Sequence, residues 1–263
     1  KKCVEVGDGY ICLDDDTKVN ADFVLLSIGV SPETAFLKDS GIALGQRGEI
    51  LVSERMETTA ADVYAIGDAV AVSNFVTKEP CVIPLAGPAN KQGRIVADIL
   101  CGRNCSYEGS LGTSIMKLFD MTVAVTGVKE ETLQAKGIDY RKSFTYSGSH
   151  AGYYPGADMM LVKLIFHPAS GKIFGAQIVG HSGVDKRIDS ISNAIRFGLT
   201  VYDLQKMELA YAPPFSSAKD PVNMAGYVAG NILGGSMEPY YVEDLKLLPQ
   251  DALYIDVRTR EEY

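Results

Sequence analysis

An apolar stretch that ends in Gly67-Asp68 constrains the fold of this 263-residue chain more than any other segment. Residues 63–66 are apolar and β-prone, which predicts a buried strand, and Gly67 would let a bound group approach the backbone closely. An aspartate at the carboxyl edge of an α/β sheet can accept hydrogen bonds from sugar-like hydroxyls. The stretch therefore predicts a sheet edge that contacts a nucleotide, although an ordinary Gly-Asp turn would carry the same two residues.

With its flanking residues, the segment 58–68 resembles the second FAD-contacting motif of the flavoprotein disulfide reductases that have two dinucleotide-binding domains. The resemblance implies that Gly67 and Asp68 contact the cofactor and that Asp68 holds the ribityl chain of FAD. It extends along nearly the whole chain. The fold class that it implies is α/β, with the C-terminal parts of the FAD/NAD(P)-binding domains followed by an α+β dimerisation domain.

Composition excludes several classes of function. The chain has 25 Lys and Arg against 33 Asp and Glu, a net charge of −8, and no basic stripe, which argues against nucleic acid. No run approaches the roughly 18 apolar residues of a membrane span, and the N-terminus lacks the core of a signal peptide. Five irregularly spaced cysteines fit a reducing compartment, and three scattered histidines support no metal site. We expect a cytoplasmic protein that binds neither nucleic acid nor membranes.

The beginning of the chain predicts strands at residues 10–13 and 22–28, the second apolar enough for a sheet covered on both faces. A chain that binds two dinucleotides should contain two Gly-x-Gly-x-x-Gly loops, and none occurs in this sequence. In the related flavoproteins, the segment matching 28–32 closes the NAD(P)H domain, and the redox cysteine lies upstream. We therefore expect a C-terminal fragment that is inactive alone because it lacks the glycine-rich loops and the redox cysteine.

The same resemblance predicts four parts along the chain. They are the end of an NAD(P)H-binding domain (1–30), the C-terminal part of an FAD-binding domain (31–107), a dimerisation domain (108–236) and the truncated start of a rhodanese domain (239–263). The last assignment depends on Asp256-Val257-Arg258, which resembles the opening of a rhodanese and predicts a strand followed by a charged helix start. A fusion of these two modules would indicate sulfane-sulfur chemistry.

A helix is predicted to begin near residue 87, because Pro88 suits a first turn and apolar residues recur at 95, 96, 99 and 100. A helix N-terminus carries free N–H groups and about half a positive charge, so it could stabilise an anionic reduced flavin. Packing alone would also explain the pattern. The resemblance to the flavin-facing helix of these reductases favours the flavin and implies three further cofactor contacts, Ala86, Gly87 and Ala89.

From Leu111 onward the pattern changes to α+β and resembles the dimerisation domain of the same flavoproteins, which implies a homodimer. Gly226 and Gly230, four residues apart, predict close helix packing in a soluble protein. Strands are predicted at 113–119, 121–127, 159–166 and 173–179, and helices at 130–136, 186–198, 203–208 and 221–233.

Two tyrosines lie on loops of this block, Tyr153 in an aromatic turn and Tyr211 before two prolines. A tyrosine with a pKa near 10 is a neutral donor at pH 7, so a pair could hydrogen-bond a leaving thiolate. Most tyrosines are packing residues. These loops, however, resemble those of the coenzyme A-disulfide reductases, which implies that Tyr153 and Tyr211 are catalytic and reach the flavin and redox cysteine of the other subunit. His167-Pro168 lacks the following glutamate of glutathione-reductase-like proteins, which disfavours that subfamily.

The function implied by the resemblance is FAD- and NAD(P)H-dependent reduction of coenzyme A disulfide, coenzyme A persulfide or polysulfide. One alternative is an NADH oxidase or peroxidase of the same architecture, in which a cysteine sulfenate meets oxygen or peroxide. A second is a non-redox dimerising scaffold for a rhodanese sulfur carrier.

Overall fold

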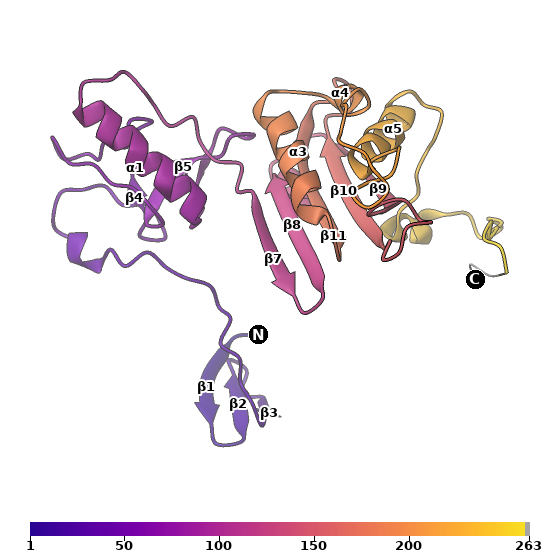
Figure 1. Ribbon diagram of the computed structural model, residues 1–263. Coiled ribbons are helices and arrows are strands. Elements are labelled where there is room, and N and C mark those ends of the chain that lie inside the picture. The colour runs from indigo at the N-terminus through magenta and orange to yellow at the C-terminus, as the bar shows by residue number, and fades with distance from the viewer. Residues whose placement is uncertain (261–263) are drawn as a thin grey trace.

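The computed structural model describes residues 1–260, which form three separate sheets (Figure 1). The first is antiparallel, in the order β1 (Cys3–Gly7), β2 (Tyr10–Leu13) and β3 (Lys18–Asn20). Asp8 and Gly9 make the two-residue turn between β1 and β2, with Gly9 at a positive φ of 76°. The predicted strand at 10–13 is confirmed.

The strand predicted at residues 22–28 is wrong. This segment joins none of the sheets formed by residues 1–260, and Leu26 and Ile28 are 77% and 84% exposed. An apolar run of this kind becomes a strand only where neighbouring strands take its backbone hydrogen bonds and other elements cover both of its faces. Those partners are missing from the described residues.

The second sheet is small and carries the Gly67-Asp68 turn. Strand β4 (Ile50–Leu51) runs parallel to β5 (Val70–Ser73), and β6 (Pro80–Cys81) pairs antiparallel with β5; the short helix η1 (Ala35–Leu37) precedes them. Helix α1 (Ala86–Leu100) lies against this sheet (Figure 1), and its Ile95 and Val96 pack on a core that includes Met56 and Val70. The predicted helix near 87 is confirmed.

The buried strand predicted at 63–66 is also wrong. The chain folds back on itself there: Ala65 N–H donates to the Met56 carbonyl at 3.0 Å and Thr58 N–H to the Val63 carbonyl at 2.9 Å. Only the single bridge between Glu57 and Tyr64 forms. The Gly67-Asp68 turn therefore lies before strand β5 instead of after a strand.

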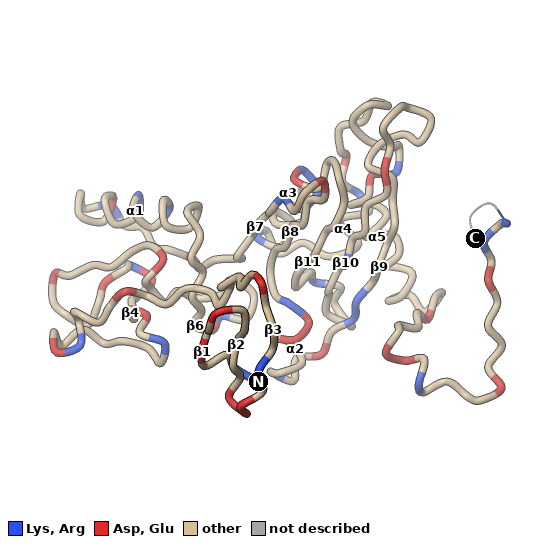
Figure 2. Tube along the Cα trace, turned by 90° about the horizontal axis from the view of Figure 1, so that it is seen from below, with Lys and Arg blue, Asp and Glu red and all other residues tan. Residues whose placement is uncertain are grey.

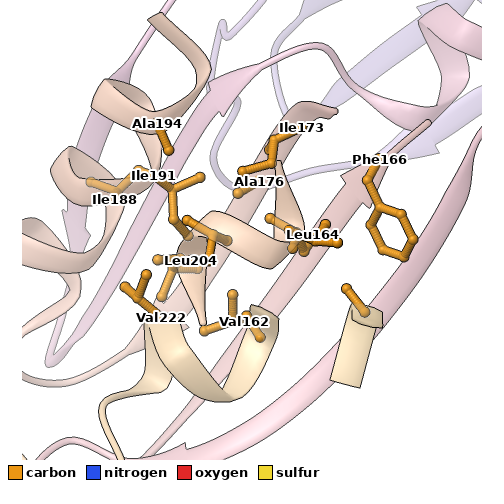
Figure 3. Packing of buried hydrophobic residues seen from close by; sticks show 14 of the residues in the cluster. Val162, Leu164, Phe166, Ile173, Ala176, Ile188, Ile191, Ala194, Leu204 and Val222 are labelled. Atoms are coloured by element: carbon orange, nitrogen blue, oxygen red, sulfur yellow. The ribbon is translucent and has the colours of Figure 1, made fainter. Parts of the chain in front are cut away.

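The third sheet has five antiparallel strands in the order β7-β8-β11-β10-β9. Helices α3 (Val184–Arg196), α4 (Val201–Leu204) and α5 (Pro221–Leu233) pack on one face, and α2 (Glu130–Ala135) lies on the other, where its Leu133 contacts Ile165. Figure 3 shows the main core, which lies between the sheet and helices α3, α4 and α5, with Ile191 and Leu204 directed toward Val162 and Leu164. The strands are β7 (Ser114–Leu118), β8 (Met121–Gly127), β9 (Arg141–Gly148), β10 (Met159–Phe166) and β11 (Ile173–Gly180).

Most predicted elements of this third part are confirmed. The β10–β11 hairpin and α5 agree with the predicted bounds within one residue, whereas α4 is shorter and earlier than the predicted 203–208. A Cβ on Gly226 would lie 2.9 Å from both Leu204 Cβ and the Val201 carbonyl oxygen, so α4 and α5 pack backbone to backbone as predicted.

After α5, the helix η2 (Val242–Leu247) leads into a segment that projects away from the sheets (Figure 2). Residues 253–257 pair with no strand of the described chain, so the strand predicted at the Asp256-Val257-Arg258 motif is not formed. The remainder of the predicted rhodanese start, 261–263, lies outside the described residues. Figure 2 also shows acidic and basic residues interspersed along the chain.

Candidate functional site

A side chain of helix α1 fixes the turn at Gly67. Gly67 has a positive φ of 92°, and a Cβ added there would meet nothing within 4 Å, so a ligand can approach its backbone. Its N–H donates to Oε1 of Gln92, a residue of α1 that is only 2% exposed, at 2.7 Å. The turn is therefore fixed from behind by a buried amide.

Asp68 is exposed and lines a cavity of about 270 Å³. The cavity is built from segments distant in sequence, since Pro32, Arg47 and Pro84 also line it. Pro84 lies two residues before α1, so the acidic side chain and the approach to the helix face the same space. A free carboxylate in such a cavity can accept hydrogen bonds from ligand hydroxyls.

Helix α1 begins with an uncapped N-terminus. Its N-cap residue is Leu85, which offers no side-chain hydrogen bond, and Ala86 and Gly87 in the first turn are exposed. Ala89 N–H already donates to the Leu85 carbonyl at 3.2 Å. Gly87 lines a second cavity, of about 350 Å³, together with Lys91 and residues of α3. Free N–H groups and a nearby lysine favour an anionic or electron-rich ligand group.

The structure brings the two predicted catalytic tyrosines together. The hydroxyls of Tyr153 and Tyr211 lie near one another, and the neighbouring Tyr211 hydroxyl is the main reason why the pKa of Tyr153 is raised above its ordinary value. Both side chains are solvent-accessible, Tyr153 being 78% exposed. The loops themselves meet through Ala151 N–H, which donates to the Pro213 carbonyl at 3.3 Å. The pair can therefore present phenolic hydroxyls to a group outside this chain.

His150 lies on the same loop as Tyr153. Its Nδ1 lies 3.1 Å from the Ser149 hydroxyl, and its ring packs edge-on against Tyr154 at a centroid distance of 5.9 Å. Neither Tyr153 nor Tyr211 lines the two cavities beside α1 in the described part of the chain. The predicted cofactor residues and the tyrosine pair thus form two separate clusters.

Sequence reasoning missed the residues that hold these clusters. Gln92 fixes Gly67, and Arg187 with Asp220 lies beneath the tyrosine loops. A polar residue on the buried face of an amphipathic helix was the available signal for Gln92 and Arg187, because such a side chain needs a partner. Across residues 1–260 the structure has no cluster of three or more metal-ligating side chains and no helix with the length and apolarity to cross a bilayer.

The sequence matches two family models. Residues 3–93 match "Pyridine nucleotide-disulphide oxidoreductase", and residues 113–221 match "Pyridine nucleotide-disulphide oxidoreductase, dimerisation domain". A protein of Staphylococcus haemolyticus, strain JCSC1435, named "Coenzyme A disulfide reductase", is 36% identical over 233 residues, which are 88% of this chain and 52% of the relative. The chain spans about half the length of the curated relatives it matches.

Two solved structures share the fold. One, described as "reduced Bacillus anthracis CoADR-RHD", is 49% identical with a TM-score of 0.86, over 91% of this chain and 43% of that one. The other, described as "a NAD-Dependent Persulfide Reductase from A. fulgidus", is 34% identical with a TM-score of 0.86, over 97% and 49%. The predicted fold class, with parts of the dinucleotide-binding domains followed by a dimerisation domain, is confirmed.

Proposed function

The chain belongs to the pyridine nucleotide-disulphide oxidoreductase family, and on that premise we propose that the intact protein uses NAD(P)H and FAD to reduce coenzyme A disulfide, coenzyme A persulfide or polysulfide. The proximity of Tyr153 and Tyr211, on two loops joined by the hydrogen bond from Ala151 N–H to the Pro213 carbonyl, carries this proposal. Relatives named for coenzyme A disulfide and persulfide reduction support the same substrate class.

The cluster around α1 fits one side of a flavin site. FAD, when bound, supplies the electron relay between NAD(P)H and a protein thiol. Asp68 would accept hydrogen bonds from the ribityl hydroxyls in its cavity, and the unobstructed backbone at Gly67 would lie beside the cofactor. The exposed first turn of α1, with Ala86, Gly87 and Ala89, would direct its partial positive charge at the flavin ring.

The tyrosine pair would act on the sulfur substrate. When a disulfide bond is cleaved, one sulfur leaves as a thiolate, and a neutral phenol can donate a hydrogen bond to it without losing its own proton. A phenol with a pKa near 10 is already protonated at physiological pH, and the pKa of Tyr153 is raised above that by the neighbouring Tyr211 hydroxyl. Hydroxyl donors on neighbouring loops would therefore stabilise the negative charge that develops on the leaving sulfur.

We also propose a homodimer in which each subunit presents Tyr153 and Tyr211 to the flavin site of the other. The match of residues 113–221 to a dimerisation domain supports it, as do the exposed tyrosines, which lie away from the Asp68 cavity of their own chain. Light scattering of the intact protein should give twice the monomer mass. A monomer with full activity would contradict the shared site.

We infer a cytoplasmic location from the five free thiols. We also propose, from the resemblance of Asp256-Val257-Arg258 to the opening of a rhodanese, that a rhodanese domain begins in this part of the chain.

Substrate preference tests the proposed function. The intact protein should be yellow, and NADH or NADPH should bleach it. We expect kcat/KM for coenzyme A disulfide or persulfide to exceed the values for oxygen and hydrogen peroxide by at least about 100-fold. A preference for oxygen or peroxide would support the oxidase or peroxidase alternative, and a colourless protein would support the non-redox scaffold.

A further inference from the structure

A buried ion pair lies directly beneath the two tyrosine loops. Arg187 of α3 is 1% exposed, and its Nη2 and Nε donate to Asp220 Oδ2 at 2.8 and 3.1 Å. Asp220 is also buried and caps α5 by accepting from Val222 N–H at 3.0 Å. Burying two charges is costly unless their remaining hydrogen-bonding capacity is used, so the other partners of Arg187 are informative.

Apart from the Gly183 carbonyl at the start of α3, which accepts from Arg187 Nη1 at 3.1 Å, those partners belong to the two tyrosine loops. Arg187 Nη2 donates to the Ser149 carbonyl at 2.9 Å, four residues before Tyr153, and to the Ser216 hydroxyl at 3.1 Å, five residues after Tyr211. The Ser216 hydroxyl in turn donates to Asp220 Oδ2 at 2.6 Å. One guanidinium therefore connects two loops that are about sixty residues apart in the sequence.

We propose that Arg187 and Asp220 are positioning residues that fix the Ser149 and Ser216 loops so that the Tyr153 and Tyr211 hydroxyls stay paired and aimed at the sulfur substrate. This inference rests on the proposed function. The tyrosine side chains are too exposed for packing to hold them, so their placement depends on their loop backbones. A buried ion pair adds little net stability. It does fix the positions of the groups that accept from it, because a guanidinium donates in a fixed planar pattern.

Loop order can be measured without any turnover. In the intact flavoprotein, Arg187→Lys keeps the charge but cannot reach Asp220, Ser149 and Ser216 together. Ser216→Ala leaves the ion pair and cuts only the link to the Tyr211 loop. We expect faster amide exchange in peptides covering 149–157 for Arg187→Lys, and in those covering 210–217 for both variants. Glu130→Gln, which breaks another ion pair of the same domain on the opposite sheet face, should leave both loops unchanged. Unchanged exchange in both Arg187→Lys and Ser216→Ala would overturn the proposal.

The functional test compares the effect of Arg187→Lys in the presence and in the absence of the two tyrosine hydroxyls. Arg187→Lys and Ser216→Ala should each slow reoxidation of the reduced enzyme by coenzyme A disulfide about 10- to 100-fold and leave flavin reduction by NAD(P)H unchanged. In the Tyr153→Phe/Tyr211→Phe double variant, Arg187→Lys should slow reoxidation further by less than about 2-fold, because the hydroxyls that it would misplace are already absent.

An equal slowing in both backgrounds would show that Arg187 acts on general stability and would overturn the positioning role. If the tyrosine variants slow reoxidation but Arg187→Lys and Ser216→Ala do not, the positioning proposal fails and the proposed function stands. If the tyrosine variants themselves have wild-type rates, both fail.

Discussion

The buried side chain of Gln92 accepts a hydrogen bond from the backbone N–H of Gly67 at 2.7 Å. This contact couples the helix that begins at Ala86 to the turn that presents Asp68, although the two residues are 25 positions apart. Gly67 holds a positive φ, a conformation that a side chain disfavours, so the amide contact helps to keep the turn in place. The Gly67-Asp68 turn and helix α1, which together form the proposed flavin site, are thus held together by this hydrogen bond.

Replacing Gln92 by leucine should therefore weaken flavin binding. The substitution preserves side-chain size but leaves the Gly67 N–H without its acceptor, at a cost of about 1–3 kcal/mol. In the intact protein we expect a lower ratio of flavin to protein absorbance after dialysis. Asp98→Asn, which alters only an exposed pairing with Arg94 and Arg103 on the last turn of α1, is the control. Full flavin occupancy in Gln92→Leu would show that the Gly67 turn keeps its conformation without this hydrogen bond.

Asp68→Ala should lower flavin occupancy by a different route. It removes a charge-assisted hydrogen bond to the ribityl chain, worth roughly 1.5–3 kcal/mol, without disturbing Gln92. Flavin affinity measured by titration of the deflavinated protein should fall about 10- to 100-fold, whereas Asp39→Asn on an exposed loop should have no effect. An unchanged affinity removes Asp68 from the site.

Glu130 should make stability depend on pH. Burial alone would raise its pKa, but hydrogen bonds from Lys142, Lys163 and Tyr140 lower it from 4.5 to about 2. Because the folded-state pKa lies below the unfolded value, its stabilisation is complete above pH 4.5 and is lost as the pH falls toward 2.

Glu130→Gln should accordingly lower the free energy of unfolding at pH 7 by about 2 kcal/mol, and the difference from the wild type should shrink below pH 4.5. Urea unfolding at a series of pH values measures it. The exposed neighbour Glu131 provides the control variant Glu131→Gln. A difference that stays constant from pH 7 to pH 3 would mean that the carboxylate charge does not contribute.

Local signals in the sequence predict some elements well. Helix α5 begins where Asp220 caps it and Pro221 occupies the first turn, and both are read from the sequence alone. Strand β9 was not predicted, because its inward side chains include Ser143, Thr145 and Ser147 while Phe144 and Tyr146 face outward. Its polarity pattern is therefore the reverse of what a half-buried strand leads one to expect.

The candidate site is predictable only in part. Asp68 and the tyrosines were found through a family resemblance carried by short motifs. The contacts that hold them, Gln92 with Gly67 and Arg187 with Asp220, join residues 25 and 33 positions apart, and no local periodicity specifies such pairs. The apolar segments at 22–28 and 63–66 were misjudged because a strand depends on partners as well as on its own side chains.

Tyr153 and Tyr211 are proposed to stabilise the thiolate released from the sulfur substrate. Replacing either tyrosine by phenylalanine removes one hydroxyl donor and keeps the ring, so the disulfide half-reaction should slow by about 10²–10³. Tyr146→Phe, a similarly exposed tyrosine on β9, is the control.

Stopped-flow absorbance of the intact flavoprotein measures the effect of the two hydroxyls, since it separates flavin bleaching by NAD(P)H from reoxidation by coenzyme A disulfide. We predict unchanged bleaching and slowed reoxidation in Tyr153→Phe and Tyr211→Phe, with wild-type values for both steps in Tyr146→Phe. Wild-type reoxidation in both single variants and in the double variant would contradict the claim and leave the two tyrosines as packing residues.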